Sequence, residues 1–209
     1  MGLRLTDVVK NLLIINVIAF AATHFTGDFG REWLIRFSVF FPTSEYFQPY
    51  QVVTYMFMHG DLMHIFFNMF ALVMFGSAIE SLWGPKRFLL YYFLTGFGAL
   101  ALEFAVKYYE FESGSLSPDA VNIPMLGASG AVFGILAAFG MMFPNSIIRL
   151  IIPPIPIKAK YFVLIYAGLE IFLGIGNFGT GIAHFAHVGG ALFGFLLILY
   201  WRSTGERLH

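Results

Sequence analysis

Six long apolar stretches dominate this chain and decide what it can fold into. Shorter segments rich in glycine, proline and charged residues separate them, and they cover residues 10–26, 61–83, 87–108, 127–143, 157–174 and 181–201. Crossing the hydrocarbon core of a bilayer takes a helix of about 20 apolar residues, so these stretches fit membrane spans. An open strand would leave backbone groups unsatisfied in lipid. We therefore predict an all-α, polytopic membrane protein with a bundle of six spanning helices.

The composition agrees with a lipid environment and excludes several classes of function. Hydrophobic residues make up 58% of the chain and charged residues only 11%, whereas soluble domains carry about 25% charged residues. The 209 residues leave room for one membrane domain, residues 1–209, and for no second soluble domain. Twelve basic and twelve acidic residues give no net charge and no basic block, so we expect no nucleic-acid partner. The absence of cysteine excludes disulfides, thiolate metal sites and a cysteine nucleophile.

Basic residues are distributed unequally between the two sides that six spans create. Because basic residues favour the cytoplasmic side, both termini and the connections Gly84–Lys86 and Pro144–Lys160 are predicted to be cytoplasmic. No clear cleavage site follows the first apolar stretch, which we expect to be a retained span. The predicted cytoplasmic set is Arg4, Lys10, Lys86, Arg87, Arg149, Lys158, Lys160, Arg202 and Arg207, and the outward set is Arg31, Arg36 and Lys107.

The first outward loop, Gly27–Gly60, is long, rich in aromatic residues and interrupted by prolines. We expect it to be neither a regular helix nor a polar linker. Long loops in compact domains are usually functional or disordered, and the apolar content of this one argues against disorder. We therefore expect it to lie in the membrane interface beside the bundle, with Trp33, Tyr46 and Tyr50 at the level of the headgroups.

Three groups of polar residues lie within or beside the predicted spans, where such side chains are costly and need an explanation. His64 and Asn68 are four residues apart and therefore share one helix face. The predicted orientation places His64, Ser129 and His187 all in the outward half of the membrane. The groups are His59, His64 and Asn68 at the second span, Gly127, Ser129 and Gly130 at the fourth, and His184 and His187 at the sixth.

Small residues recur at every fourth position in the fourth and sixth spans. Gly130 and Gly134 form one such stripe, and Gly190 and Gly194 form the other. Stripes of this kind let two helix backbones approach closely, so we predict that these two spans pack against each other. His187 lies on the same face as Gly190 and is expected to point across this contact.

Ser129 stands at the start of the fourth span, where the neighbouring glycines permit a tight turn and leave backbone N–H groups free for a ligand. A serine that faces a histidine beside exposed amides is a nucleophile with its base and part of an oxyanion hole. Two other interpretations remain. The small residues could serve packing alone, and the histidines could hold a metal ion or a haem. We expect neither Glu80 nor Glu170 to orient His187, and without a carboxylate beside the histidines we predict no metal and no cofactor.

In this order and on these spans, the motifs resemble those of the rhomboid family of intramembrane serine proteases. The resemblance rests on His64-x-x-x-Asn68, Gly127-x-Ser129-Gly130 and the run from Ala186-His187 to Gly190-x-x-x-Gly194, and it covers nearly the whole chain. It implies a Ser/His dyad without an acidic third member, with Ser129 as nucleophile and His187 as general base. It further implies that the oxyanion is held by His64, Asn68 and backbone N–H groups of Ser129 and Ala128.

The resemblance also sets expectations about function. It implies cleavage of transmembrane protein substrates in a cell (inner) membrane, at a site open to the outer side, with span five and the Ile175–Thr180 connection as the substrate gate. The chain departs from the family pattern at Tyr50-Gln51, where many members have Trp-Arg, and at Phe133, where some have tyrosine. Phe133 can still stack on the base. The alternative is a catalytically inactive rhomboid-like module that binds membrane helices. The sequence does not indicate an oligomeric state.

Overall fold

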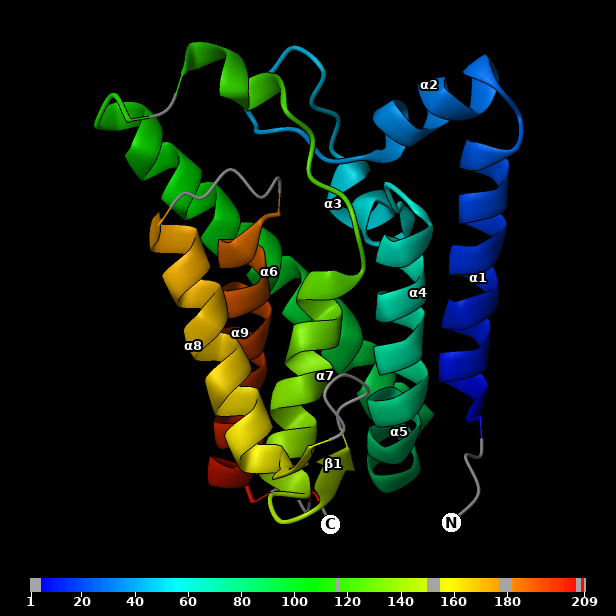
Figure 1. The fold of residues 1–209 in the computed structure, drawn as a ribbon, viewed down its shortest axis with the longest axis vertical. Helices are drawn as coiled ribbons and strands as arrows, with labels where there is room; N and C mark the ends of the chain where they lie inside the picture. The colour runs from blue at the N-terminus through cyan, green and yellow to red at the C-terminus, as the bar shows by residue number, and fades with distance from the viewer. Residues whose placement is uncertain (1–4, 116, 150–154, 177–181, 206–207, 209) are drawn as a thin grey trace.

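The computed structural model describes residues 5–115, 117–149, 155–176, 182–205 and 208, which fold mainly into one bundle of helices (Figure 1). The second apolar stretch forms two α-helices joined by a π-helical segment. The helices of the bundle are α1 (Asp7–His24), α4 (Leu62–Ala71), η2 (Leu72–Gly76), α5 (Ser77–Trp83), α6 (Pro85–Glu112), α7 (Ser129–Met142), α8 (Ala159–Gly176) and α9 (His184–Ser203).

Five helices among the described residues are long and apolar enough to cross a membrane, namely 7–24, 62–83, 85–112, 159–176 and 184–203. The prediction of an all-α polytopic membrane protein is confirmed. The fourth predicted stretch, 127–143, contains the shorter apolar helix α7, which has 14 residues. At 1.5 Å per residue α7 is about 21 Å long, less than the ~30 Å hydrocarbon core. Residue 181, at the start of the last predicted stretch, lies outside the described residues.

The helix α7 lies at the centre of the bundle and is almost wholly buried. Residues 130–138 and Gly140 are all buried, and the helix contacts α6, α8 and α9. The helix α8 is the opposite case, because only Ala159 and Glu170 are buried among its 18 residues. Most side chains of α8 therefore face away from the protein, as expected of a helix at the edge of a membrane bundle.

The glycines of α7 and α9 let the two helix backbones touch. A Cβ atom added at Gly190 would collide with the carbonyl oxygen of Gly130, and one added at Gly194 would lie 3.2 Å from the Cα of Gly134. The predicted packing of the fourth span against the sixth is therefore confirmed. The helix α7 also packs closely against α6, where a Cβ atom added at Gly134 would lie 2.5 Å from the side chain of Thr95.

The first loop differs from the prediction because it contains a regular helix, α2 (Asp28–Phe37), followed by α3 (Gln51–Thr54) and the 3₁₀ turn η1 (Tyr55–Phe57). Asp28 in the first turn and Arg36 in the last complement the helix dipole. Phe29, Trp33 and Phe37 recur every four residues. The rings of Phe29 and Trp33 are tilted with centroids 4.8 Å apart, and those of Trp33 and Phe37 meet edge-on at 5.6 Å. The prolines interrupt only the later part of the loop, so the expectation of no regular helix was wrong.

Segments near both ends of the chain bind α5 at the end of the bundle opposite α2 (Figure 1). The indole nitrogen of Trp83 donates a hydrogen bond to the carbonyl of Leu208 at 3.2 Å. Backbone amides of Val8 and Val9 donate to the carboxylate of Glu80 at 3.0 and 2.9 Å. At this end the strands β1 (Ile147–Arg149) and β2 (Pro156–Lys158) pair antiparallel, with Ile148 opposite Ile157. The predicted start of the fifth stretch at residue 157 thus falls in β2, and α8 begins at Ala159.

We predict that Gly190→Ala lowers the melting temperature of the purified protein in detergent, because the new methyl group would collide with a rigid backbone carbonyl. Overpacking of this kind typically costs about 1–3 kcal/mol. Gly168→Ala is the matched control, since nothing lies within 4 Å of a Cβ atom at that position of α8. The control should be neutral or slightly stabilising. Equal melting temperatures for the two variants would contradict the close contact between α7 and α9.

Candidate active site

The chain just before α7 is held by the first loop and turns sharply into the helix. Val39 pairs with Met125 through two backbone hydrogen bonds of 2.9 and 2.8 Å, and the amide of Gly127 donates to the carbonyl of Tyr55 at 2.9 Å. Gly127 has a φ of +124°, a conformation that favours glycine. Ser129 follows as the first residue of α7. The first loop thus fixes the position of this turn and the direction in which α7 starts, and with them the position of Ser129.

Ser129 and His187 form a hydrogen-bonded pair across the contact between α7 and α9. The Oγ atom of Ser129 lies 2.8 Å from Nε2 of His187. The ring of Phe133, one turn after Ser129, stacks on the imidazole with centroids 4.3 Å apart and planes 6° apart. The expected stacking of Phe133 is therefore present. The hydroxyl, the imidazole and the aromatic ring are all fixed by the two helices that the glycines hold together.

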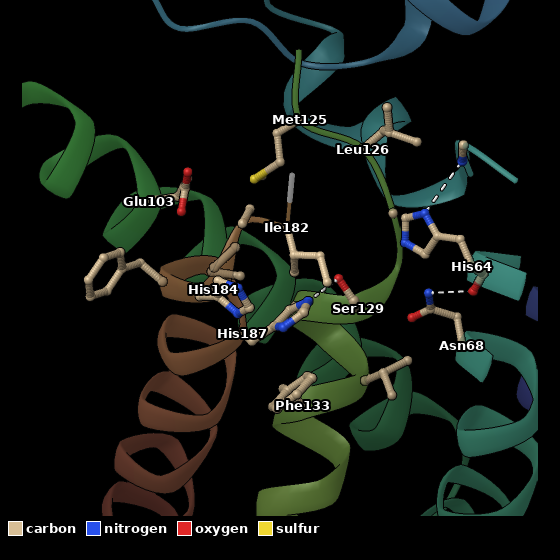
Figure 2. A pocket seen from close by; sticks show the side chains of 18 of the residues that line it. His64, Asn68, Glu103, Met125, Leu126, Ser129, Phe133, Ile182, His184 and His187 are labelled. Atoms are coloured by element: carbon tan, nitrogen blue, oxygen red, sulfur yellow. Dashed lines mark hydrogen bonds between the residues drawn. The ribbon is translucent and has the colours of Figure 1, made fainter. Parts of the chain in front are cut away.

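His64 and Asn68 face this pair from α4, on the other side of the turn (Figure 2). The amide of Gly60 donates to Nδ1 of His64 at 3.4 Å, which places the proton of a neutral imidazole on Nε2. A Cβ atom added at Gly127 would lie 2.7 Å from this Nε2 and 3.7 Å from the Oγ of Ser129. The absent side chain of Gly127 thus leaves a space bordered by a hydroxyl and an N–H donor.

Asn68 lies one turn after His64 and is buried at the same face of α4. Its Nδ2 donates to the carbonyl of His64 at 2.9 Å, and an amide nitrogen carries a second N–H. Asp61 caps the helix by accepting a hydrogen bond from the amide of His64 at 2.8 Å. This cap fixes the first turn of α4, which carries His64, and Asn68 follows one turn later.

His59 lies in the loop before α4 and is fully buried. Its ring packs edge-on against that of His64, with centroids 5.0 Å apart. Burial, together with the neighbouring His64, lowers the pKa of His59 to about 3. His59 is therefore neutral at physiological pH and supports His64 as a packing partner without adding charge.

Five of these side chains line one cavity of about 890 Å³, namely His64, Asn68, Ser129, Phe133 and His187. Figure 2 shows Ser129 and His187 pointing toward each other, His64 and Asn68 on the opposite side, and Phe133 beneath. Ala128 is fully buried, and Gly190 and Gly194 lie at the contact between α7 and α9. Seven of the site residues predicted from the sequence line this cavity: His64, Asn68, Gly127, Ser129, Gly130, Phe133 and His187.

The sequence-based expectation about Glu170 was wrong. Its Oε2 atom lies 3.0 Å from Nδ1 of His187 and 2.6 Å from Nδ1 of His184. A carboxylate therefore does stand beside the two histidines, although it comes from a different helix. Glu80, in contrast, binds the start of α1 at the far end of the bundle.

Glu170, His184 and His187 are the group of described residues whose ligand atoms come close enough to hold a metal ion, within 4.8 Å of one another. Their shortest separations are hydrogen-bond distances. A metal ion would have to displace the protons that these hydrogen bonds share. The arrangement as it stands therefore satisfies the three side chains without an ion.

Sequence reasoning also missed the role of Gln51. Its side-chain amide donates to the carbonyls of Arg36 and Tyr46 at 3.1 Å each, and its oxygen accepts from the amides of Gln48 and Phe40 at 3.0 and 3.4 Å. Gln51 is buried and ties together the whole later part of the first loop. Gln51, one of the two residues at which the chain departs from the family pattern, therefore anchors the loop through its own hydrogen bonds. The sequence signal for this role was a polar residue in an aromatic-rich segment. That signal does not indicate which backbone carbonyls the side chain binds.

Comparisons with known proteins agree with this architecture. Residues 46–204 match the Rhomboid domain. The chain is 31% identical to "Rhomboid protease AarA" of Providencia stuartii over 73% of this chain and 56% of that protein. It is 28% identical to "Rhomboid-like protease 3" of Toxoplasma gondii over 85% of this chain and 61% of that protein. It is 31% identical to "Rhomboid protein 1, mitochondrial" of Saccharomyces cerevisiae over 72% and 41%, respectively.

The chain thus spans about half the length of the curated relatives it matches. The matched region begins within the first loop and ends just after α9, so it contains α3 to α9 and every residue that lines the cavity. The chain belongs to the rhomboid family.

Proposed function

We propose that this protein is an intramembrane serine protease in which Ser129 is the nucleophile and His187 the general base. The observation that carries the proposal is the 2.8 Å contact between the Ser129 hydroxyl and Nε2 of His187. A serine is a weak nucleophile until a base within hydrogen-bond distance takes its proton. The cavity beside this pair leaves space for a peptide segment.

Acylation would begin when a scissile carbonyl enters the space in front of Gly127. The Oγ atom of Ser129 attacks the carbonyl carbon while Nε2 of His187 takes the hydroxyl proton. The negative charge that develops on the carbonyl oxygen is met by the N–H donors of His64 and Asn68 and by free amides at the start of α7. The imidazolium then gives its proton to the leaving nitrogen as the C–N bond breaks, which leaves an acyl-enzyme.

Deacylation requires water at a serine that belongs to a membrane-embedded helix. His187 removes a proton from this water, the oxygen attacks the acyl carbon, and Ser129 leaves with its proton restored. The shortness of α7 supports access of water, because the helix begins below the ends of α4 and α6 (Figure 1). Non-helical backbone at membrane depth is tolerated where it lines a water-filled cavity.

The substrates we propose are peptide bonds in or near transmembrane segments of other membrane proteins. A peptide bond in an intact helix is shielded by its own hydrogen bonds, so the substrate must unwind beside the bundle before it reaches Ser129. We further propose an inner-membrane location with the termini and the β1–β2 end in the cytoplasm. The basic residues near that end support this orientation, among them Lys86, Arg87 and Arg202. The active site would then open to the outer side.

We predict that Ser129→Ala and His187→Ala each abolish cleavage of a fluorescent single-span reporter protein in proteoliposomes. Each change removes one half of the proton transfer that activates the serine. The wild-type protein serves as the positive control, and product bands on a gel measure the cleavage. Cleavage by Ser129→Ala at the wild-type rate would refute the proposed nucleophile. A folded wild-type protein that cleaves no reporter and reacts with no fluorophosphonate would favour a helix-binding module.

We predict that Asn68→Ala lowers the rate constant of reporter cleavage by about 10²–10³-fold, the usual effect of losing one oxyanion donor. Asn16→Ala is a closely matched control. Asn16 is also buried, and its Nδ2 donates to the carbonyl four residues earlier in α1 at 2.7 Å, as that of Asn68 does in α4 at 2.9 Å. The control removes the same type of side-chain to backbone hydrogen bond, but from a helix position that does not line the cavity. It should therefore retain the wild-type rate per folded molecule. Equal rates for the two variants would argue against Asn68 as a donor.

A further inference from the structure

One carboxylate oxygen joins two imidazole rings behind the proposed dyad. The Oε2 atom of Glu170 lies 2.6 Å from Nδ1 of His184 and 3.0 Å from Nδ1 of His187. The exposed fractions of the three side chains are only 6% for Glu170, 6% for His184 and 12% for His187. Hydrogen bonds to a charged group are strong in such a water-poor environment. This contact therefore constrains both rings.

The contact also decides which nitrogen of His187 carries the proton. An ionised carboxylate can only accept hydrogen bonds, so Nδ1 of each histidine must donate to Glu170. The neutral His187 then has an unprotonated Nε2, and this is the atom that lies 2.8 Å from the Ser129 hydroxyl. The opposite tautomer would place a proton on Nε2 and leave no lone pair to accept the serine proton.

We propose that Glu170 is the positioning residue of His187, and thus an acidic third member of the proposed dyad. It holds the tautomer and orientation of the ring and stabilises the imidazolium that forms when Nε2 takes the proton of Ser129. The carboxylate keeps its charge throughout, and no proton leaves the imidazole through it. This inference rests on the function proposed above.

The surroundings of Glu170 separate this role from substrate binding. Glu170 does not belong to the residues that line the cavity, although its neighbours Tyr166 and Leu173 do. It therefore acts on the reaction through His187. His184 donates a second hydrogen bond to Oε2 of Glu170, the oxygen that His187 also contacts. This bond holds the carboxylate in place beside His187.

The position of Glu170 on α8 strengthens the argument. Ala159 and Glu170 are the two buried residues of this helix, and Ala159 is its first residue. A carboxylate on a helix that mostly faces lipid is costly unless it is paired within the protein. The helix α8 also reaches His187 through a second set of contacts. Tyr166 of α8 packs on Phe133 of α7 with ring centroids 4.9 Å apart, and Phe133 stacks on His187. The helix α8 thus supports the base at two adjacent points.

The test measures the reaction of a fluorophosphonate fluorophore with the protein of residues 1–209 in detergent that contains a metal chelator. The concentration dependence of labelling separates the maximal inactivation rate constant, kinact, from the apparent binding constant, KI. We expect Glu170→Gln to lower kinact by about 10²–10⁴-fold with KI unchanged, since an amide holds the ring but not its tautomer or charge. Glu170→Asp retains the charge on a shorter side chain and should restore part of kinact.

Glu80→Gln is the matched control, because Glu80 is a carboxylate at the far end of the bundle, and as whole residues Glu80 and Glu170 are equally buried. It should leave kinact per folded molecule unchanged. Labelling of the wild type and of Glu170→Gln with equal kinact would overturn the positioning role alone. If Glu170→Gln does not fold, equal kinact for Glu170→Asp and the wild type would overturn it. A folded wild type that shows no labelling would instead overturn the proposed function itself.

Discussion

The contact between the backbones of α7 and α9 is the interaction on which the rest of this structure depends. Gly190 lies against the carbonyl of Gly130, so closely that no larger residue fits between the helices. Ser129 is adjacent to one of these glycines, and His187 lies one turn before the other. The 2.8 Å separation of hydroxyl and imidazole follows from this arrangement. Lipid offers no hydrophobic force between helices, so the close van der Waals packing must itself hold the pair.

The remaining elements fix the depth and direction of the site. The first loop binds the chain before α7 through the Tyr55 carbonyl and the pairing of Val39 with Met125. Gln51 in turn holds that loop together from within. The helix α4 presents His64 from the other side of the turn, and α8 supplies Glu170 behind His187. Ser129, His187 and His64 thus reach the cavity from three different helices, and Glu170 reaches His187 from a fourth.

The parts of this arrangement that depend on spacing along one helix could be predicted from the sequence. The stripes of Gly130 and Gly190 predict the helix contact, because four residues make about one turn. The approach of Glu170 could not be predicted, since it depends on how α8 is rotated about its axis against α9. The helix α2 was missed because the prolines of the loop outweighed the recurrence of Phe29 and Trp33. The roles of Ser129 and His187 stay proposals, which the 2.8 Å contact between their side chains supports.

The most direct test of the account is to map the serine that reacts with a fluorophosphonate in the folded wild-type protein. Labelled protein would be digested, and the modified peptide would be identified by tandem mass spectrometry. An activated serine needs a base within hydrogen-bond distance, and Ser129 has one in His187. The account predicts a single adduct on the Oγ of Ser129 that is lost in His187→Ala. An adduct on a different serine, or equal labelling of Ser129 without His187, would contradict it.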